Sequence, residues 1–247
     1  VDVTTADIYV AALAHRRRRQ NTFADNARLL GIPPARVVEI DLHPSKEVAL
    51  RKDVARFPFM RERGVDHERQ ARDVLQIQTT ALVRRMQSIG TENLVIGVSG
   101  GLDSTLALLV SAQAMDALGL PRSNILAYTM PGFGTSEKTR ANAETLTNLV
   151  GATFEELDIR PAATAMLEAM GHPFGRGEPV YDLTFENVQA GLRTDYLFRL
   201  AGQHQGIVVG TGDLSELALG WCTFGVGDHM SHYGVNAGVP KTMIQHL

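Results

Sequence analysis

A short run of small and acidic residues, Ser99-Gly100-Gly101-Leu102-Asp103-Ser104, has the composition of a phosphate-binding loop. Two adjacent glycines let the backbone approach a ligand closely and adopt conformations closed to other residues. If a helix starts after them, the free N–H groups of its first turn form an anion site, and the serine hydroxyls add donors. A carboxylate at Asp103 makes sense beside phosphates if it holds Mg²⁺.

The alternative for this run is a glycine turn that only closes a strand–helix unit, with Asp103 stabilising the start of the helix. Two glycines alone would favour that alternative. The full string, placed after a strand and before a helix, favours ligand binding. It fits neither the Walker pattern, which needs Gly-Lys-Ser/Thr, nor the dinucleotide-binding pattern Gly-x-Gly-x-x-Gly.

The elements around the loop predict an α/β fold. The apolar run Leu94–Val98 predicts a buried strand that leads into the loop, and a helix is expected over Leu102–Leu118. Helical and strand patterns alternate from about residue 66 onward, which is typical of a doubly wound parallel sheet with helices on both faces. Further strands are predicted at 125–129, 153–159 and 207–211, and further helices at 66–89, 137–150 and 182–203.

Two segments give more specific expectations. In the helix at 66–89, a buried face is indicated by the helical spacing of Val74, Ile77, Ala81, Leu82 and Met86. Residues 1–65 are poorly periodic and interrupted by prolines, so we expect short strands and an extended linker there, without an independent core.

Composition excludes several classes of protein. The chain has 247 residues, a net charge of −3 and a single cysteine, Cys222, which excludes an intrachain disulfide framework and suits a reducing cytosol. No stretch approaches a membrane span. The basic run His15–Arg19 lacks interleaved aromatic residues, which favours a solvated segment over a nucleic-acid patch.

The first residue is Val and the last seven, 241–247, look like the start of a helix, so we expect an interior fragment of a longer protein.

The string Ser99–Ser104 resembles the PP-loop of the N-type ATP pyrophosphatases, which cleave ATP between the α- and β-phosphates and adenylate an acceptor oxygen. Several later segments resemble NAD⁺ synthetases within that superfamily: Gly210–Glu216 matches the Gly-Thr-x-Asp/Asn-x-x-Glu element, and the others are Asn187–Arg193, Trp221–Phe224, Gly227-Asp228 and Val239–Thr242.

The resemblance implies roles for individual residues. Asp103 and Glu216 are expected to be catalytic and to hold Mg²⁺. ATP is expected to contact Gly97, Val98, Ser99, Gly100, Gly101, Leu102, Asp103, Ser104 and Thr211. Deamido-NAD⁺ is expected to contact Asn187, Arg193, Glu216, Trp221, Cys222, Thr223, Phe224, Asp228 and Lys241.

Some of these residues have plainer interpretations. Glu216 is also explained as a first-turn carboxylate favoured by the helix dipole, and Asn187 as a solvent-facing helix residue. Trp221 has either a core or a ligand-stacking role. His229 and His232 lack the further ligands that a metal pair needs.

The implied reaction is ATP-dependent amidation of deamido-NAD⁺ to NAD⁺ through an adenylated nicotinate carboxylate, with ammonia or glutamine as the nitrogen source. Residues 1–65 then resemble the tail of an upstream nitrilase-like glutaminase domain plus a linker, and 66–247 a C-terminally incomplete ATP-pyrophosphatase domain. A cytoplasmic homo-oligomer without nucleic-acid or membrane partners is expected. The alternatives are a GMP synthetase-like or tRNA-thiolating PP-loop enzyme, and a non-catalytic ATP-binding module.

Overall fold

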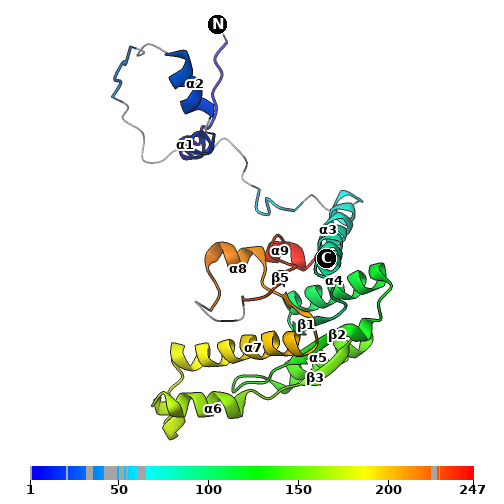
Figure 1. The fold of residues 1–247 in the computed structure, drawn as a ribbon. Helices are drawn as coiled ribbons and strands as arrows, with labels where there is room; N and C mark the ends of the chain where they lie inside the picture. Colours follow the sequence, from blue (N-terminus) through cyan, green and yellow to red (C-terminus); the bar gives the residue numbers. More distant parts are fainter. Residues whose placement is uncertain are drawn as a thin grey trace. The chain divides into compact units, whose positions relative to one another are not determined.

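The computed structural model describes residues 2–20, 22–31, 36–41, 49, 53, 55–60, 65–223, 227 and 229–247. The chain divides into two compact units, Val1–Pro58 and Phe59–Leu247 (Figure 1).

In the first unit the described residues form two helices, α1 (Val10–Arg19) and α2 (Thr22–Leu30). The expectation of short strands is therefore wrong for these two segments. The sequence of α1 is mostly alanine, leucine and arginine, which rank among the best helix formers, so local propensity outweighs the missing hydrophobic period. No described residue of this unit is buried, in agreement with the expectation that it has no core of its own.

The second unit is built on a five-stranded parallel sheet in the order β3-β2-β1-β4-β5. Its strands are β1 (Leu94–Gly97), β2 (Ile125–Thr129), β3 (Thr153–Glu156), β4 (Ile207–Gly210) and β5 (Tyr233–Gly234). The central strand β1 pairs with β2 on one side and with β4 on the other, so that Leu94 lies between Ile125 and Ile207.

Helices lie on both faces of this sheet (Figure 1). They are α3 (Val65–Ile89), α4 (Leu102–Leu118), α5 (Glu137–Val150), α6 (Arg160–Ala169), α7 (Leu183–Gln203), α8 (Leu214–Leu219) and α9 (Lys241–Ile244), with short 3₁₀ turns at Arg122–Asn124 and Pro173–Arg176. Successive side chains of a strand point to opposite faces. Leu94 and Ile96 accordingly join the core formed with α3, α4 and α5, whereas Val95 joins the core formed with α7. The predicted doubly wound fold is confirmed.

Local capping explains where two of the helices begin. The Ser136 hydroxyl accepts a hydrogen bond from the Thr139 N–H at the start of α5, and the Asp182 carboxylate accepts one from the Phe185 N–H at the start of α7. Such caps satisfy backbone donors that have no partner within the helix. The predicted helices at 137–150 and 182–203 agree with the structure to within one residue.

The segment after β3 differs from the prediction. The strand expected over 153–159 ends at Glu156, and α6 begins at Arg160. Proline at the first turn of α6 fits this start, because its fixed φ suits a helix and its missing N–H costs nothing there. No element was predicted over 160–169, although the proline at position 161 was a signal for the start of this helix.

The face predicted for α3 is only partly correct. Leu82 and Met86 are buried, but Ile77 is 68% exposed. Since α3 packs mainly along α4, only a narrow stripe of it is covered.

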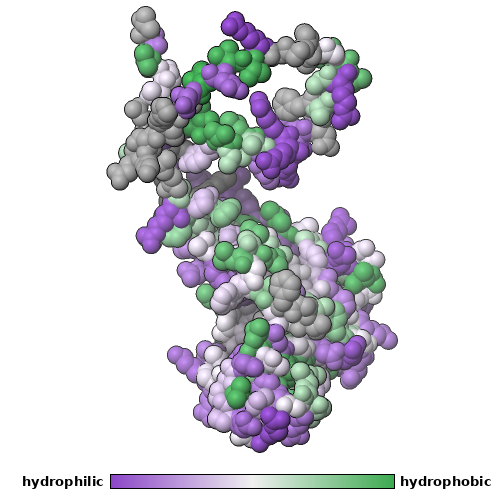
Figure 2. Space-filling view, turned by 90° about the vertical axis from the view of Figure 1, so that its left-hand side faces the viewer, coloured by the Kyte–Doolittle hydropathy of each residue, from purple (hydrophilic) through white to green (hydrophobic). Residues whose placement is uncertain are grey.

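The surface and the helices bear on possible membrane contact. None of the described helices is both long enough and apolar enough to cross a bilayer. The face of the second unit in Figure 2 mixes hydrophilic and hydrophobic residues.

The core assignment can be tested with a matched pair of isoleucines. Ile96→Ala removes a side chain with no exposed surface from the middle of β1, and we expect it to lower the free energy of unfolding by about 2–5 kcal/mol because the cavity does not refill. Ile77→Ala makes the same chemical change at an exposed position and should cost less than about 1 kcal/mol. Urea unfolding of both variants measures the difference, and similar losses would contradict the assignment.

Candidate active site

The order of the strands determines where a site can form. From β1 the chain winds outward through β2 and β3 and then returns to β4 on the other side of β1. The gap between β1 and β4 is therefore the topological switch point, where open parallel sheets bind ligands at the carboxyl ends of the strands. The loop 98–101 follows β1, and residues 211–213 follow β4, so the two predicted motifs meet there.

The loop after β1 is held by its own hydroxyl groups. The Ser104 hydroxyl donates to the Gly101 carbonyl at 3.0 Å and lies 3.2 Å from the Ser99 hydroxyl. The Gly101 N–H donates to the Ser99 hydroxyl at 3.3 Å. These bonds fix the turn that starts α4, whose 17 residues direct the positive end of their dipole toward the loop.

Gly100 is required by packing against α5. Its φ of +79° lies in the left-handed region, and an added Cβ would come 2.5 Å from the carbonyl oxygen of Thr139. A larger residue therefore meets both backbone strain and a steric clash with a helix backbone. The sequence prediction attributed the glycine pair to close approach of a ligand, whereas for Gly100 the structure shows close approach of α5.

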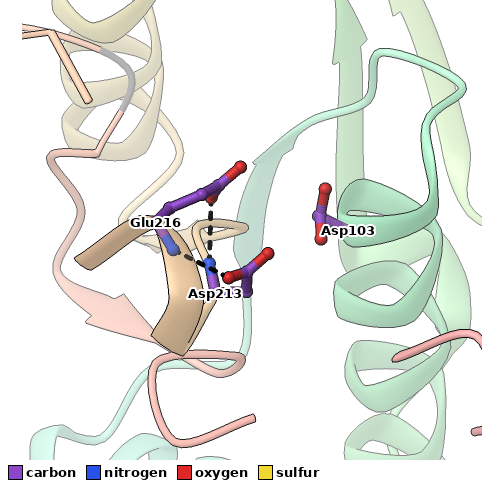
Figure 3. A group of neighbouring side chains, drawn as sticks. All are labelled: Asp103, Asp213 and Glu216. Carbon is purple, nitrogen blue, oxygen red and sulfur yellow. Dashed lines mark hydrogen bonds between the residues drawn. The ribbon is translucent and has the colours of Figure 1, made fainter. Parts of the chain in front are cut away.

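The start of α8 holds Glu216 and Asp213 in a reciprocal capping box. The Asp213 carboxylate accepts the Glu216 N–H, and the Glu216 carboxylate accepts the Asp213 N–H, both at 3.0 Å (Figure 3). Such a box satisfies two unpaired donors and fixes both side chains. Figure 3 shows Asp103, at the start of α4, facing these two residues across the gap.

Within the described part of the chain, Asp103, Asp213 and Glu216 form one carboxylate cluster, with an oxygen of each lying within 4.8 Å of the others. The Lys241 ammonium is inserted among them. Its Nζ lies 2.6 Å from Asp103 Oδ2, 2.7 Å from Asp213 Oδ2 and 3.3 Å from Glu216 Oε1. The cluster therefore brings three acids and one base from α4, α8 and α9 to the switch point.

The pKa shifts of Asp213 and Lys241 both favour the ionised form of the side chain. Burial by itself raises the pKa of Asp213, but the bond from Lys241 and the Glu216 N–H outweigh it and hold that pKa below its usual value. Burial likewise lowers the pKa of Lys241, but its bonds to Asp103 and Asp213 outweigh burial and raise that pKa. Lys241 and Asp213 are thus both ionised at neutral pH.

Asn236, a fully buried residue that sequence reasoning missed, joins the two sides of the site. Its Nδ2 donates to the Asp103 carbonyl at 2.9 Å and to the Thr211 carbonyl at 3.1 Å. Its Oδ1 accepts from Gln78 Nε2 of α3 at 3.1 Å. The amide group of Asn236 therefore ties α4, the end of β4 and α3 together. Because Asn236 lies in a loop, hydrophobic periodicity gave no signal for this role.

A cavity of about 780 Å³ opens over the switch point. This volume lies in the range of small-molecule sites. Its walls combine the PP-loop, the end of β4, the start of α7 and the segment after α8. The predicted site residues that line it are Ser99, Asp103, Ser104, Asn187, Thr211, Glu216, Trp221, Cys222 and Thr223.

Other predicted site residues lie elsewhere. Gly97, Val98, Gly100, Gly101 and Leu102 do not line the cavity but shape the strand and turn beside it. The Arg193 Nε donates to the Met130 carbonyl at the end of β2, outside the cavity lining.

The remaining predicted residues have different outcomes. Trp221 is 80% exposed, which rules out the core interpretation. Phe224 and Asp228 fall outside the described residues. Of the two histidines, His229 lines the cavity, whereas His232 Nδ1 accepts the Val208 N–H.

Asp213 was also missed as a site residue. A signal for it existed, since Asp213-x-x-Glu216 has the spacing of a capping box. Cavity-lining Leu183, Glu186 and Ser231 gave no comparable signal.

The bridging role of Asn236 predicts a measurable loss. Asn236→Ala leaves two backbone carbonyls and the Gln78 amide short of a partner in a buried place, and should lower the free energy of unfolding by about 2–3 kcal/mol. Asn124→Ala removes a similar bond, from Nδ2 to the Glu92 carbonyl, at an exposed position and should cost under about 0.5 kcal/mol. Urea unfolding compares the two, and an equal loss for both variants would show that Asn236 is not a structural bridge.

Comparison with known proteins agrees with this geometry. The chain is 53% identical over 247 residues to the glutamine-dependent NAD(+) synthetase of Mycobacterium leprae, covering 99% of this chain and 36% of that protein. It is 51% identical, with the same coverage, to the protein of that name from Mycobacterium tuberculosis H37Rv. The chain thus spans about a third of the length of these curated relatives.

Solved structures show the same fold. A glutamine-dependent NAD+ synthetase from Acinetobacter baumannii, in complex with ADP, superposes with a TM-score of 0.63 at 27% identity, covering 71% of this chain and 32% of that one. NMN synthetase from Francisella tularensis gives 0.61 at 26% identity, covering 72% and 68%. The NAD synthase family model matches residues 74–247. This chain, with its PP-loop facing an acidic capping box across the switch point, belongs to the NAD synthase family.

Proposed function

We propose that this chain is the synthetase part of an enzyme that converts deamido-NAD⁺, ATP and ammonia into NAD⁺, AMP and pyrophosphate. The observation that carries the proposal is the cavity at the switch point, in which Asp103 of the PP-loop faces Glu216 of α8. Family membership and the similarity to glutamine-dependent NAD(+) synthetases support the choice of substrate.

The reaction has two steps, joined by an intermediate in which the nicotinate carboxylate is adenylated. The nicotinate carboxylate attacks the α-phosphorus of ATP, so that a new P–O bond forms while the bond to the β-phosphate breaks and pyrophosphate leaves. Ammonia then attacks the acyl carbon, the C–N bond forms, AMP leaves and a proton passes to solvent. Adenylation is needed because a free carboxylate has a poor leaving group.

The residues of this chain supply positioning and electrostatics. The Ser99 and Ser104 hydroxyls line the cavity and would contact the departing pyrophosphate near the positive end of α4. Thr211 would contact ATP from the opposite wall. Asn187 of α7 and the exposed Trp221 would bind the dinucleotide, with the indole ring available for stacking.

The carboxylate cluster fits Mg²⁺. Asp103 Oδ1 is buried and, among the described residues, has no hydrogen-bond partner, as a metal ligand would be before its ion binds. Hard cations prefer carboxylate oxygens. Asp103 and Glu216 face the cavity and would hold the ion, which when bound neutralises charge on phosphate oxygens.

The source of ammonia is a separate part of the proposal. The relatives are named glutamine-dependent, and this chain spans 36% of the Mycobacterium leprae protein. We propose that a nitrilase-like glutaminase precedes this chain in the natural protein, with residues 1–65 as its tail and linker and 66–247 in the synthetase domain. A cytoplasmic homo-oligomer, dependent on neither membrane nor nucleic acid, completes the proposal.

ATP–pyrophosphate exchange in the natural full-length protein tests the substrate. Exchange of labelled pyrophosphate into ATP should require deamido-NAD⁺, because adenylation is reversible only when the acceptor is bound. Nicotinate mononucleotide is the matched control acceptor, since it carries the same carboxylate without the adenylate half. Exchange that needs xanthosine monophosphate or tRNA instead would favour another PP-loop enzyme, and ATP binding without exchange would favour a nucleotide-binding module.

The role of Asp103 is tested by Asp103→Asn, which keeps the shape of the side chain but removes its charge. Exchange should fall by roughly 100-fold or more, because several kcal/mol of charge stabilisation are lost. Asp116→Asn on the same helix breaks only an exposed ion pair with Arg122 and should leave exchange within about twofold. Equal exchange in the two variants would remove Asp103 from the catalytic residues.

A further inference from the structure

A buried histidine holds the start of α7 from the turn that follows α6. The His172 side chain is only 7% exposed. Its Nδ1 accepts the Phe174 N–H at 3.2 Å, and its Nε2 lies 3.0 Å from Asp182 Oδ1. Because a neutral ring whose Nδ1 accepts a hydrogen bond carries its proton on Nε2, His172 donates to Asp182 while it caps the 3₁₀ turn Pro173–Arg176.

Asp182 passes this contact on to the helix. Its Oδ1, which accepts from His172, also accepts the Phe185 N–H at 3.0 Å and so caps α7. The bond from Phe185 contributes most to a pKa of Asp182 below its usual value, and the bond from His172 adds to it against the opposing effect of burial. Asp182 is therefore charged at neutral pH, and hydrogen bonds to a charged acceptor are the stronger kind.

A ring contact closes this set of interactions. The centroids of the Phe174 and Phe185 rings lie 4.7 Å apart. Each of these two residues also donates its backbone N–H to one member of the His172–Asp182 pair. Four residues thus form a closed loop of contacts, in which none can shift without disturbing its two neighbours.

The closed loop ties α7 to α6. The two helices pack along each other (Figure 1). Leu167 of α6 and Phe185 of α7 share one buried apolar cluster, and the His172 N–H donates to the Leu167 carbonyl at 2.9 Å. The position of the first turn of α7 is therefore set from α6, independently of the PP-loop.

That first turn and the next form one wall of the cavity. Leu183, Glu186 and Asn187 of α7 line the cavity, whereas neither His172 nor Asp182 does. The walls that carry the PP-loop and the end of β4 come from other elements. A shift of α7 would consequently move the dinucleotide wall and leave the ATP wall in place.

We propose that His172 and Asp182 are positioning residues for the dinucleotide acceptor, and that their hydrogen bond holds the α7 wall where it binds deamido-NAD⁺. This inference rests on the proposed function, which gives the α7 wall to the dinucleotide. Neither residue contacts the substrate, so their effect is on binding of the acceptor and not on binding of ATP.

Two substitutions of His172 separate its two bonds. His172→Asn places an amide oxygen where Nδ1 accepts from Phe174 and so keeps the cap of the turn, but it is too short to reach Asp182. His172→Gln places an amide N–H group near the position of Nε2 and keeps the bond to Asp182, but it loses the cap.

Two further substitutions complete the series. Asp182→Ser breaks the link from its other end, because serine still caps α7 but is too short to meet the His172 ring. His204→Asn is the matched control at the other end of the same helix. It leaves in place the bond that the His204 carbonyl accepts from Asn93.

ATP–pyrophosphate exchange by the natural full-length protein measures KM for deamido-NAD⁺ and for ATP separately. We expect His172→Asn and Asp182→Ser each to raise KM for deamido-NAD⁺ about tenfold and to leave KM for ATP within about twofold, because only one wall is displaced. His172→Gln and His204→Asn should leave both values within about threefold. The double variant of His172→Asn and Asp182→Ser should be no worse than either single one, since both break the same link.

Three results would overturn the inference. Equal rises in the two KM values would make the pair a support of the whole domain. A rise in His172→Gln as large as that in His172→Asn would assign the effect to the cap of the turn. Additive rises in the double variant would show that the two residues act separately.

The test also separates this inference from the proposed function. If His172→Asn does not fold, the KM values of Asp182→Ser decide by the same comparison of acceptor and ATP. Any of the three contrary results, alongside exchange that depends on deamido-NAD⁺ in the unchanged protein, contradicts only this inference. Failure of the unchanged protein to catalyse that exchange contradicts the proposed function as well.

Discussion

The parallel pairing of β1 with β4 is the constraint on which the site depends. Leu94, Val95 and Ile96 pair in order with Ile207, Val208 and Val209, so both strands end at the same edge of the sheet. The helices that follow them, α4 and α8, consequently start side by side. A shift of register by one residue would turn every side chain of one strand to the other face and misplace the loop that carries Asp103.

Much of this arrangement was predictable because the relevant signals are local. The apolar runs that form β1 and β4 are bounded by glycines or polar residues, and Ser136 stands where a helix cap is needed. The order of the motifs along the chain then placed Asp103 and Glu216 at one sheet edge, since carboxyl ends of parallel strands meet there. What the sequence did not predict was α6, because residues 160–169 were assigned to neither a strand nor a helix, although a proline in its first turn is typical of a helix start.

The remaining errors come from contacts between distant segments. Arg193 holds the Met130 carbonyl, and Asn236 bridges α4 and β4, yet each looks in sequence like an ordinary polar residue. Ile77 has helical spacing but is 68% exposed. Such partners depend on how helices pack around the sheet, and a single sequence contains no direct record of that packing.

Electrostatics explains why the site needs a rigid frame. Two like charges 4 Å apart repel by about 4 kcal/mol at a dielectric constant near 20, so three neighbouring carboxylates oppose folding. The chain offsets this repulsion with the capping box, the Asn236 bridge and the ammonium of Lys241. These contacts hold Asp103 and Glu216 close together before any ligand arrives. Acidic groups fixed in this way lose little further conformational freedom when a cation and phosphates bind, which is the physical meaning of a preorganised site.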